Sequence, residues 1–237
     1  MFSRFRRSRA PEPEPDPVVE DGAFDAFDAA FGPPAEVYRD RGWTLDDTTE
    51  VFGVRSAVLT EFLARHARAM YLDGLLRIAL PGGRFDPRTW NGRGGWADDW
   101  PKERELAVFA YDWLGRLYGV DRKGQWGTAG TVTRLATGAD ALESTGQPLD
   151  GWLVETLPGD RDAILRAEDY RAWLHGGRPL DTESCASYRT PLGLGGADSV
   201  ANLERTSLVV HLSISGQLAG QIRDLPPGSK ISGITLS

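Results

Sequence analysis

One glycine-rich stretch of the sequence is of a kind that can bind phosphate. Residues 191–204 read PLGLGGADSVANLE, with three glycines among positions 193–196. A dinucleotide-binding loop has the spacing G-x-G-x-x-G and connects a strand to a helix in a parallel βαβ unit. Here Pro191 precedes the glycines, and Asp198 occupies the place of the third one. The stretch therefore indicates a tight turn with a positive φ at one or more glycines, and a nucleotide site is the less favoured alternative.

Titratable residues elsewhere form no pattern typical of catalysis or metal binding. Three histidines, His66, His175 and His211, are widely separated, and Cys185 is the single cysteine. The motifs G-x-S-x-G, H-E-x-x-H and the Walker loop are absent. One cysteine excludes an internal disulfide, and a small buried residue is the expected interpretation. We expect no catalytic residue, metal or cofactor, although a Ser-His-Asp set meets only in space and leaves a hydrolase as an alternative.

Two pairs of adjacent carboxylates, at 46–47 and 98–99, are candidates for contact with a basic partner. Exposed carboxylates in a solvated loop are the simpler interpretation of both pairs. The second pair is flanked by tryptophans, and an aromatic residue beside a charge is typical of interface hot spots. The candidate partner-binding residues are Trp96, Asp98, Asp99 and Trp100.

The charge balance favours a protein or small-molecule partner over nucleic acid. The 237 residues include 34 acidic and 27 basic ones, which gives a formal net charge of -7. Nucleic-acid binders usually carry a basic surface, whereas an acidic chain suits a basic protein partner. No apolar run approaches the roughly 18 residues of a membrane span, and no apolar segment of a secretory signal follows the N-terminal arginines. We expect a cytoplasmic protein with no membrane contact.

The patterning predicts an α+β fold: two lobes of helices packed with short, mainly antiparallel sheets, preceded by a disordered tail over residues 1–22. The tail contains PEPEPDP, which cannot form a core. His66 lies in the apolar stripe of the helix expected over 59–70, so we expect it to be a packed residue. Helical spacing predicts helices over 24–31, 59–70, 106–117, 149–156 and 160–174. Strands are expected within 75–83, 124–138, 208–215 and 230–236.

An ordered string of motifs across residues 184–231 is the most specific feature of the sequence. Cys-x-x-Tyr is followed by Pro-Leu-x-Leu-Gly-Gly-x-Asp, Asn-Leu-Glu, Ser-Gly-Gln-Leu and Leu-Pro-x-Gly. This string resembles the C-terminal domain of type VI secretion immunity proteins of the Tdi type. The chain departs from that family at Gly193, where the family commonly has Phe. The signature residues expected to have structural roles are Pro191, Gly195, Gly196, Asp198, Asn202 and Gln217.

The N-terminal half resembles, more loosely, the GAD-like domain that often precedes a Tdi-type domain. FGPP at 31–34 and the segment at 71–90 carry this resemblance. After the tail over 1–22, the two resemblances imply a GAD-like domain over 23–101 and a Tdi-type domain over 102–237. They also imply a non-enzymatic immunity protein that binds a cognate toxin, in the best-known cases a DNase, with no direct contact to nucleic acid. A regulatory or nucleotide-binding module that uses residues 193–196 is the alternative.

Overall fold

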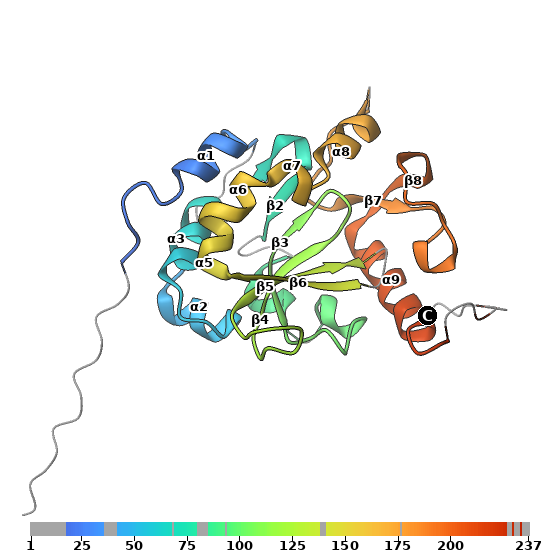
Figure 1. The fold of residues 1–237 in the computed structure, drawn as a ribbon, viewed down its shortest axis with the longest axis horizontal. Helices are drawn as coiled ribbons and strands as arrows, with labels where there is room; N and C mark the ends of the chain where they lie inside the picture. Colours follow the sequence, from blue (N-terminus) through green and yellow to red (C-terminus); the bar gives the residue numbers. More distant parts are fainter. Residues whose placement is uncertain are drawn as a thin grey trace, which may run out of the picture.

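The computed structural model describes residues 18–35, 42–67, 69–79, 85–92, 94–137, 141–175, 177–226, 229 and 233. Most of the predicted tail and nearly all of the strand predicted over 230–236 lie outside these residues. Helices and antiparallel strands are both present, as Figure 1 shows, so the predicted α+β class is confirmed.

Six antiparallel strands form the main sheet, in the order in which they occur along the chain. A separate antiparallel pair lies on the opposite side of the molecule from α2 and α3 (Figure 1). The main sheet consists of β1 (Met70–Tyr71), β2 (Leu76–Ile78), β3 (Leu106–Asp112), β4 (Leu117–Asp121), β5 (Thr131–Ala136) and β6 (Ala141–Pro148). The separate pair consists of β7 (Ser184–Tyr188) and β8 (Leu203–Ser207).

Thr44, Ser56 and Asp86 each begin a helix by accepting a hydrogen bond from one of its free backbone N–H groups. Thr44 and Asp47 form a capping box at α2, in which each side-chain oxygen accepts from the other residue's N–H. At α3 the hydroxyl of Ser56 accepts from the N–H of Leu59, without a reciprocal bond. The helices are α1 (Asp25–Phe31), α2 (Leu45–Phe52), α3 (Ala57–His66), α4 (Pro87–Trp90), α5 (Leu149–Gly151), α6 (Leu157–Gly159), α7 (Arg161–Ile164), α8 (Ala167–Leu174) and α9 (Leu208–Ile222). Short turns are η1 (Leu72–Gly74), η2 (Trp96–Asp98), the π-helical η4 (Trp152–Thr156), η5 (Leu192–Leu194) and η6 (Val200–Asn202).

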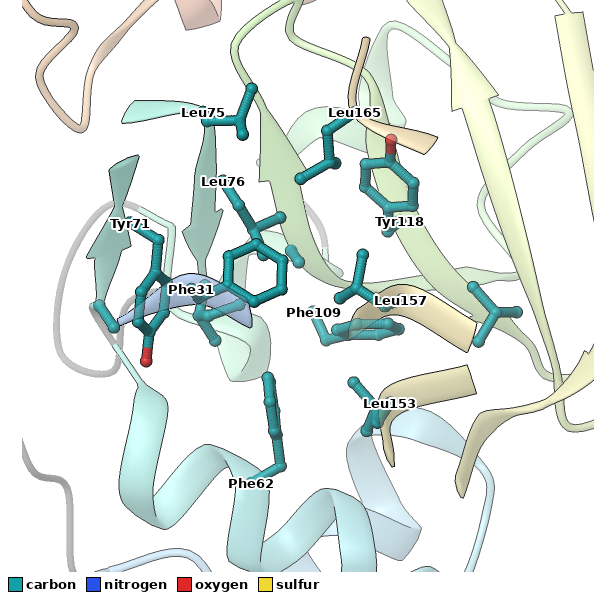
Figure 2. Close-up of a cluster of buried hydrophobic side chains, with 14 of the residues drawn as sticks. Phe31, Phe62, Tyr71, Leu75, Leu76, Phe109, Tyr118, Leu153, Leu157 and Leu165 are labelled. Carbon is teal, nitrogen blue, oxygen red and sulfur yellow. The ribbon is translucent and has the colours of Figure 1, made fainter. Parts of the chain in front are cut away.

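The central strands of the main sheet are buried on both faces. In Figure 2, Phe31 of α1, Phe62 of α3 and Leu157 of α6 surround Phe109 on one face. A second cluster covers the other face and contains Trp100 together with the start of α9. The second cluster comprises Phe85, Trp90, Trp96, Ala97, Trp100, Leu106, Val108, Tyr111, Leu117, Leu135, Cys185, Leu208, Leu212 and Ala219.

The helix predicted over 106–117 is wrong: Leu106–Asp112 forms β3, and Leu117 begins β4. Every residue of β3 is buried, because the sheet has an apolar layer on each side. A strand that is buried on both faces has apolar residues at odd and even positions, so its pattern also matches helical spacing. Gly119, at which such a helix would end, is likewise a strand position.

The strand predicted over 208–215 is also wrong, because residues 208–222 form the helix α9. Leu208, His211 and Leu212 are buried, which is the i, i+3, i+4 spacing of a helical face. The segment also resembles a strand because Val210 and Ile214, which are exposed on the helix, alternate with buried Leu208 and Leu212 along the sequence. The helices predicted near 24–31, 59–70, 149–156 and 160–174 are present, and the short strand expected after residue 74 is β2.

The predicted division at residues 101 and 102 stays a prediction. The main sheet crosses it, since β1 and β2 precede residue 101 and β3 to β6 follow it. The first core cluster likewise contains residues from Phe24 to Leu203.

Two glycine-to-alanine substitutions test whether residues 117–121 form a strand and residues 208–222 a helix. They should change the free energy of unfolding in opposite directions. Gly119→Ala places a Cβ 2.7 Å from the carbonyl oxygen of Ala107 on β3, so it should lower the free energy of unfolding by about 1–3 kcal/mol. Gly220→Ala on α9 meets nothing within 4 Å and should raise it by up to about 1 kcal/mol. Urea denaturation of both variants and the wild type checks the result. A destabilising Gly220→Ala would contradict an exposed helical position.

Candidate binding site at the C-terminal sheet

A buried carboxylate organises the turn between β3 and β4. Asp112 is fully buried, and its Oδ1 accepts from the backbone N–H groups of Leu114 and Arg116 at 3.0 and 3.2 Å. Its Oδ2 accepts from Arg116 Nε at 2.6 Å and from the Tyr118 hydroxyl at 2.9 Å. Burial disfavours the charged guanidinium, but the adjacent Asp112 carboxylate overcomes this effect and raises the pKa of Arg116. The turn therefore contains a fully hydrogen-bonded ion pair.

The same turn connects the main sheet to the C-terminal elements. Arg116 Nη2 donates to the Ile164 carbonyl at 2.9 Å, and Trp113 Nε1 donates to the Leu165 carbonyl at 2.7 Å. The backbone N–H of Ala186 on β7 donates to the Trp113 carbonyl at 2.7 Å. The end of α7 and the outer edge of β7 are thus both fixed to the turn.

A buried arginine joins β2 to β7. Arg77 Nη1 donates to the carbonyls of Ser184 and Asp181 at 2.7 and 3.1 Å, and Nη2 donates to the Asp112 carbonyl. Its guanidinium lies 4.7 Å from the centroid of the Tyr111 ring. Three carbonyls and a π face therefore surround a buried cation, and they hold residues 181–184 against the sheet.

His211 connects α9 to β7 and to the residue after β5. The Thr137 hydroxyl donates to the Gly115 carbonyl at 3.1 Å, so it must accept from His211 Nε2, which lies 2.6 Å away. Nδ1 then accepts from the Ser187 hydroxyl at 2.8 Å. Burial lowers the pKa of His211 to about 4, which keeps the imidazole neutral at physiological pH. His66 is also buried, as predicted, and its Nδ1 lies 2.6 Å from the Tyr71 hydroxyl.

The glycine-rich stretch forms a loop between β7 and β8 that is closed by Asn202. The Asn202 amide oxygen accepts from Thr190 N at 3.1 Å, and its Nδ2 donates to the carbonyls of Thr190 and Ala197, each at 2.9 Å. A Cβ at Gly196 would lie 1.8 Å from the Thr190 carbonyl oxygen. Gly195 has a φ of 84°. The amide of Asn202 and the missing side chain at 196 together determine the shape of the loop.

The other signature residues have separate local roles. Asp198 accepts from the Tyr188 hydroxyl at 2.6 Å and from Arg166 Nη1 at 2.8 Å, and these bonds lower its pKa. The Pro191 carbonyl accepts from the N–H groups of residues 194 and 196, and Gln217 Nε2 donates to Ser213 Oγ at 3.1 Å. Because the N–H groups at 194–196 all donate within the loop, they do not form a phosphate cradle.

Two grooves lie against this small sheet. One has a volume of about 310 Å³ between the sheet and α9, and its apolar wall is formed by Val210, Ile214 and Leu218. The second, about 590 Å³, lies at the end of α8 and is lined by Trp173, Leu174, Gly177, Arg178, Arg189, Leu203, Glu204 and Arg205. The two grooves share Arg189 and Glu204.

The structure separates the four predicted partner-binding residues into two kinds. Trp96 and Trp100 are only 3% and 1% exposed, and their indole N–H groups donate to Asn91 Oδ1 and to the Leu212 carbonyl. They are core residues of the second cluster, so the expectation that they serve as surface anchors is corrected. Asp98 is exposed and accepts from the N–H of Gly94, while Asp99 is half-buried. A contribution of these two carboxylates to partner binding stays a prediction.

Sequence reasoning missed the exposed apolar face of α9. Val210 and Ile214 are 48% and 40% exposed and lie one helical turn apart. The signal for this face is the absence of any charged residue from Leu208 to Ile222. A 15-residue surface helix without a charge is unusual, because its exposed side normally carries Lys, Arg, Asp or Glu.

The described residues contain neither a metal-binding cluster nor a membrane-spanning helix. No group of three His, Cys, Asp or Glu side chains there is arranged to hold a metal ion. None of the helices described is both long and apolar enough to cross a membrane.

The elements around the grooves correspond to a known family. Residues 155–219 match the family described as "T6SS immunity protein Tdi1, C-terminal". The Tdi-type resemblance is therefore confirmed for this segment, which runs from η4 through most of α9. The Tdi1-type segment thus contains both β7 and β8, the signature loop and most groove residues. The GAD-like resemblance of the N-terminal half stays a prediction.

A comparison with solved structures gives a match to the crystal structure of Atu4351 from Agrobacterium tumefaciens. The TM-score is 0.55 at 10% sequence identity, over 82% of this chain and 88% of that chain. At this identity the likeness concerns the fold alone. No curated protein matches this chain.

The pKa of His211 predicts a pH-dependent contribution to stability that is absent from His211→Gln. Its folded value of about 4 lies below the ordinary 6.5, so the unfolded chain binds the proton more tightly. Stability is therefore lost as pH falls from about 6.5 to about 4, by up to about 3 kcal/mol for this group. Denaturation curves from pH 7 to 4 should show a smaller loss in His211→Gln, whereas exposed His175→Gln should behave as wild type. Identical slopes for all three proteins would contradict a buried neutral imidazole.

The loop geometry predicts that position 196 tolerates substitution less well than position 195. Gly196→Ala requires movement of the Thr190 carbonyl and should cost more than about 2 kcal/mol. Gly195→Ala meets no atom within 4 Å and should cost only the roughly 1–2 kcal/mol of a positive φ. Melting temperatures of the two variants decide the order, and a less stable Gly195→Ala would contradict this geometry.

Proposed function

We propose that this chain is a cytoplasmic immunity protein that binds a cognate type VI secretion toxin and neutralises it by protein–protein contact. The observation that carries the proposal is the Tdi1 family match over residues 155–219, which takes in the two-stranded sheet and its signature loop. A DNase effector is the toxin that this family resemblance favours.

The charge of the chain supports a basic toxin as the partner. Its formal net charge is -7, and a nuclease that binds DNA carries a basic surface. Opposite fields of this kind accelerate association and favour the correct partner over like-charged proteins. Exposed Asp98 and half-buried Asp99 are the carboxylates that we assign to this contact.

The state of the buried titratable groups supports a binding role over a catalytic one. Burial raises the pKa of the Cys185 thiol to about 12, so the nucleophilic thiolate is not populated at neutral pH. The imidazoles of His66 and His211 are buried and hydrogen-bonded to hydroxyl groups. These buried side chains therefore stabilise the fold.

Co-expression tests the proposal directly. The reading frame adjacent to this one should be expressed in a bacterial host with and without this chain. The expected result is growth inhibition and DNA degradation by the adjacent protein alone, with growth restored and a stable complex recovered on co-expression. A toxic adjacent protein that this chain neither binds nor neutralises would overturn the proposal.

Charge reversal should identify the acidic contact. Asp98→Lys together with Asp99→Lys should weaken toxin binding at least tenfold, because it places like charges against a basic surface. Glu50→Lys with Glu155→Lys is the matched control, since it makes the same change in net charge on exposed residues that are not candidates for the contact. Biolayer interferometry gives both affinities. Equal weakening in the two variants would indicate a general charge effect, and unchanged binding would exclude Asp98 and Asp99 from the interface.

A further inference from the structure

The backbone of β8 has one edge paired and the other edge open. Pairing with β7 joins Arg189 N to the Asn202 carbonyl and Leu208 N to the Glu183 carbonyl. Hydrogen-bonded pairs alternate along an antiparallel ladder, so Glu204 and Thr206 direct their N–H and C=O groups toward β7. The intervening residue, Arg205, directs both of its backbone groups away from β7.

The open edge presents a set of groups that can pair with another strand. These are the Leu203 carbonyl, the N–H and carbonyl of Arg205, and the N–H of Ser207. No backbone hydrogen bond among the described residues uses either group of Arg205. The outer edge of β7 is different, because Ala186 N already donates to the Trp113 carbonyl. β8 is therefore the free edge of the two-stranded sheet.

The two grooves lie on opposite faces of the sheet at this edge. Thr206 and Glu204 belong to the face that looks onto α9, where they line the 310 Å³ groove. Leu203 and Arg205 belong to the other face and line the 590 Å³ groove beside α8. Successive side chains of an added strand would point alternately toward α9 and toward α8.

The linings of the two grooves differ in chemistry. On the α9 side, Val210 and Ile214 present exposed apolar surface. Arg178 and Arg205 line only the α8 groove, whereas Arg189 and Glu204, which lie 3.6 Å apart as an ion pair, line both grooves. The Arg205 guanidinium lies 5.9 Å from the centroid of the Trp173 ring. This local excess of positive charge in an acidic protein favours acidic side chains in the α8 groove.

We propose that β8 is a strand-addition site for an extended segment of the cognate toxin, in which apolar and acidic side chains alternate. The segment pairs through backbone hydrogen bonds with Leu203, Arg205 and Ser207. Its apolar side chains contact Val210 and Ile214, and its acidic side chains contact the arginines beside Trp173. Main-chain bonds contribute affinity in this mode of recognition, and the two grooves provide specificity. The inference rests on the proposed function, since it names the contact through which the toxin is held.

A toxin segment fits this edge better than a second copy of the chain. Antiparallel self-pairing centred on β8 places Arg205 directly opposite Arg205, and like charges at such positions destabilise a sheet. Formation of a homodimer by the wild type in sedimentation experiments, lost on Pro substitution of Arg205, would favour the second copy and overturn the inference.

Amide hydrogen exchange by NMR measures the added strand at the level of single residues. The probe is the protein encoded by the adjacent reading frame, carried as an inactivated variant. In the free chain, Arg205 and Ser207 should exchange faster than Glu204 and Thr206, whose N–H groups are bonded to β7. In the complex, Arg205 and Ser207 should become protected by tenfold or more. A complex in which these two amides remain unprotected overturns the strand-addition site and leaves the proposed function intact.

Matched side-chain variants test the two grooves separately. Ile214→Glu should weaken binding at least tenfold, while Leu72→Glu, which replaces an apolar residue of the same 40% exposure, should not. Arg205→Glu should have a similar effect, with Arg171→Glu on the exposed side of α8 as its control. Unchanged melting temperatures exclude misfolding as the cause. Wild-type affinity in both groove variants overturns the inference, and failure of the wild type to bind the adjacent protein overturns the proposed function as well.

Discussion

The carboxylate of Asp112 is the contact on which the arrangement of the C-terminal half depends. It holds the β3–β4 turn in one conformation through bonds to Leu114, Arg116 and Tyr118. That turn provides the carbonyl to which β7 is bonded, and Arg116 extends from it to the end of α7. Removal of one member of a buried, fully bonded ion pair leaves an uncompensated charge, which costs several kcal/mol. The small sheet is therefore fixed to the large sheet by polar bonds as well as by packing.

This attachment has a consequence for binding. β7 is bonded on both edges, Arg77 holds residues 181–184, and His211 fixes the first turns of α9. β8 and the exposed side of α9 are thus surface elements on a rigid support. Less conformational entropy is lost when such a surface binds a partner, so its contacts contribute more fully to affinity.

Much of the fold follows from the sequence, and the exceptions have physical causes. One-sided patterns gave α1 and α3 correctly, because each of these helices buries one stripe, such as Phe27 and Phe31, and exposes the rest. β3 matches helical spacing because it is buried on both faces, and α9 matches a strand because exposed Val210 and Ile214 continue the apolar alternation of Leu208 and Leu212. The loop at 191–204 was expected to be a turn, but its closure by Asn202 depends on Thr190, a contact that no spacing reveals. The candidate site was harder to predict. Trp96 and Trp100 follow a surface-like pattern yet are buried, and Trp100 donates to the Leu212 carbonyl of α9, which is 112 residues away in the sequence.

The central claim is that the Tdi1-type segment presents the surface through which this chain holds its toxin. The most direct measurement is a crystal or cryo-EM structure of the chain in complex with the protein encoded beside it. The account predicts an extended toxin segment along β8, with contacts to Val210 and Ile214 of α9 on one face and to Arg205 on the other. An interface confined to α1, α2 and α3, on the opposite side of the molecule (Figure 1), would contradict it.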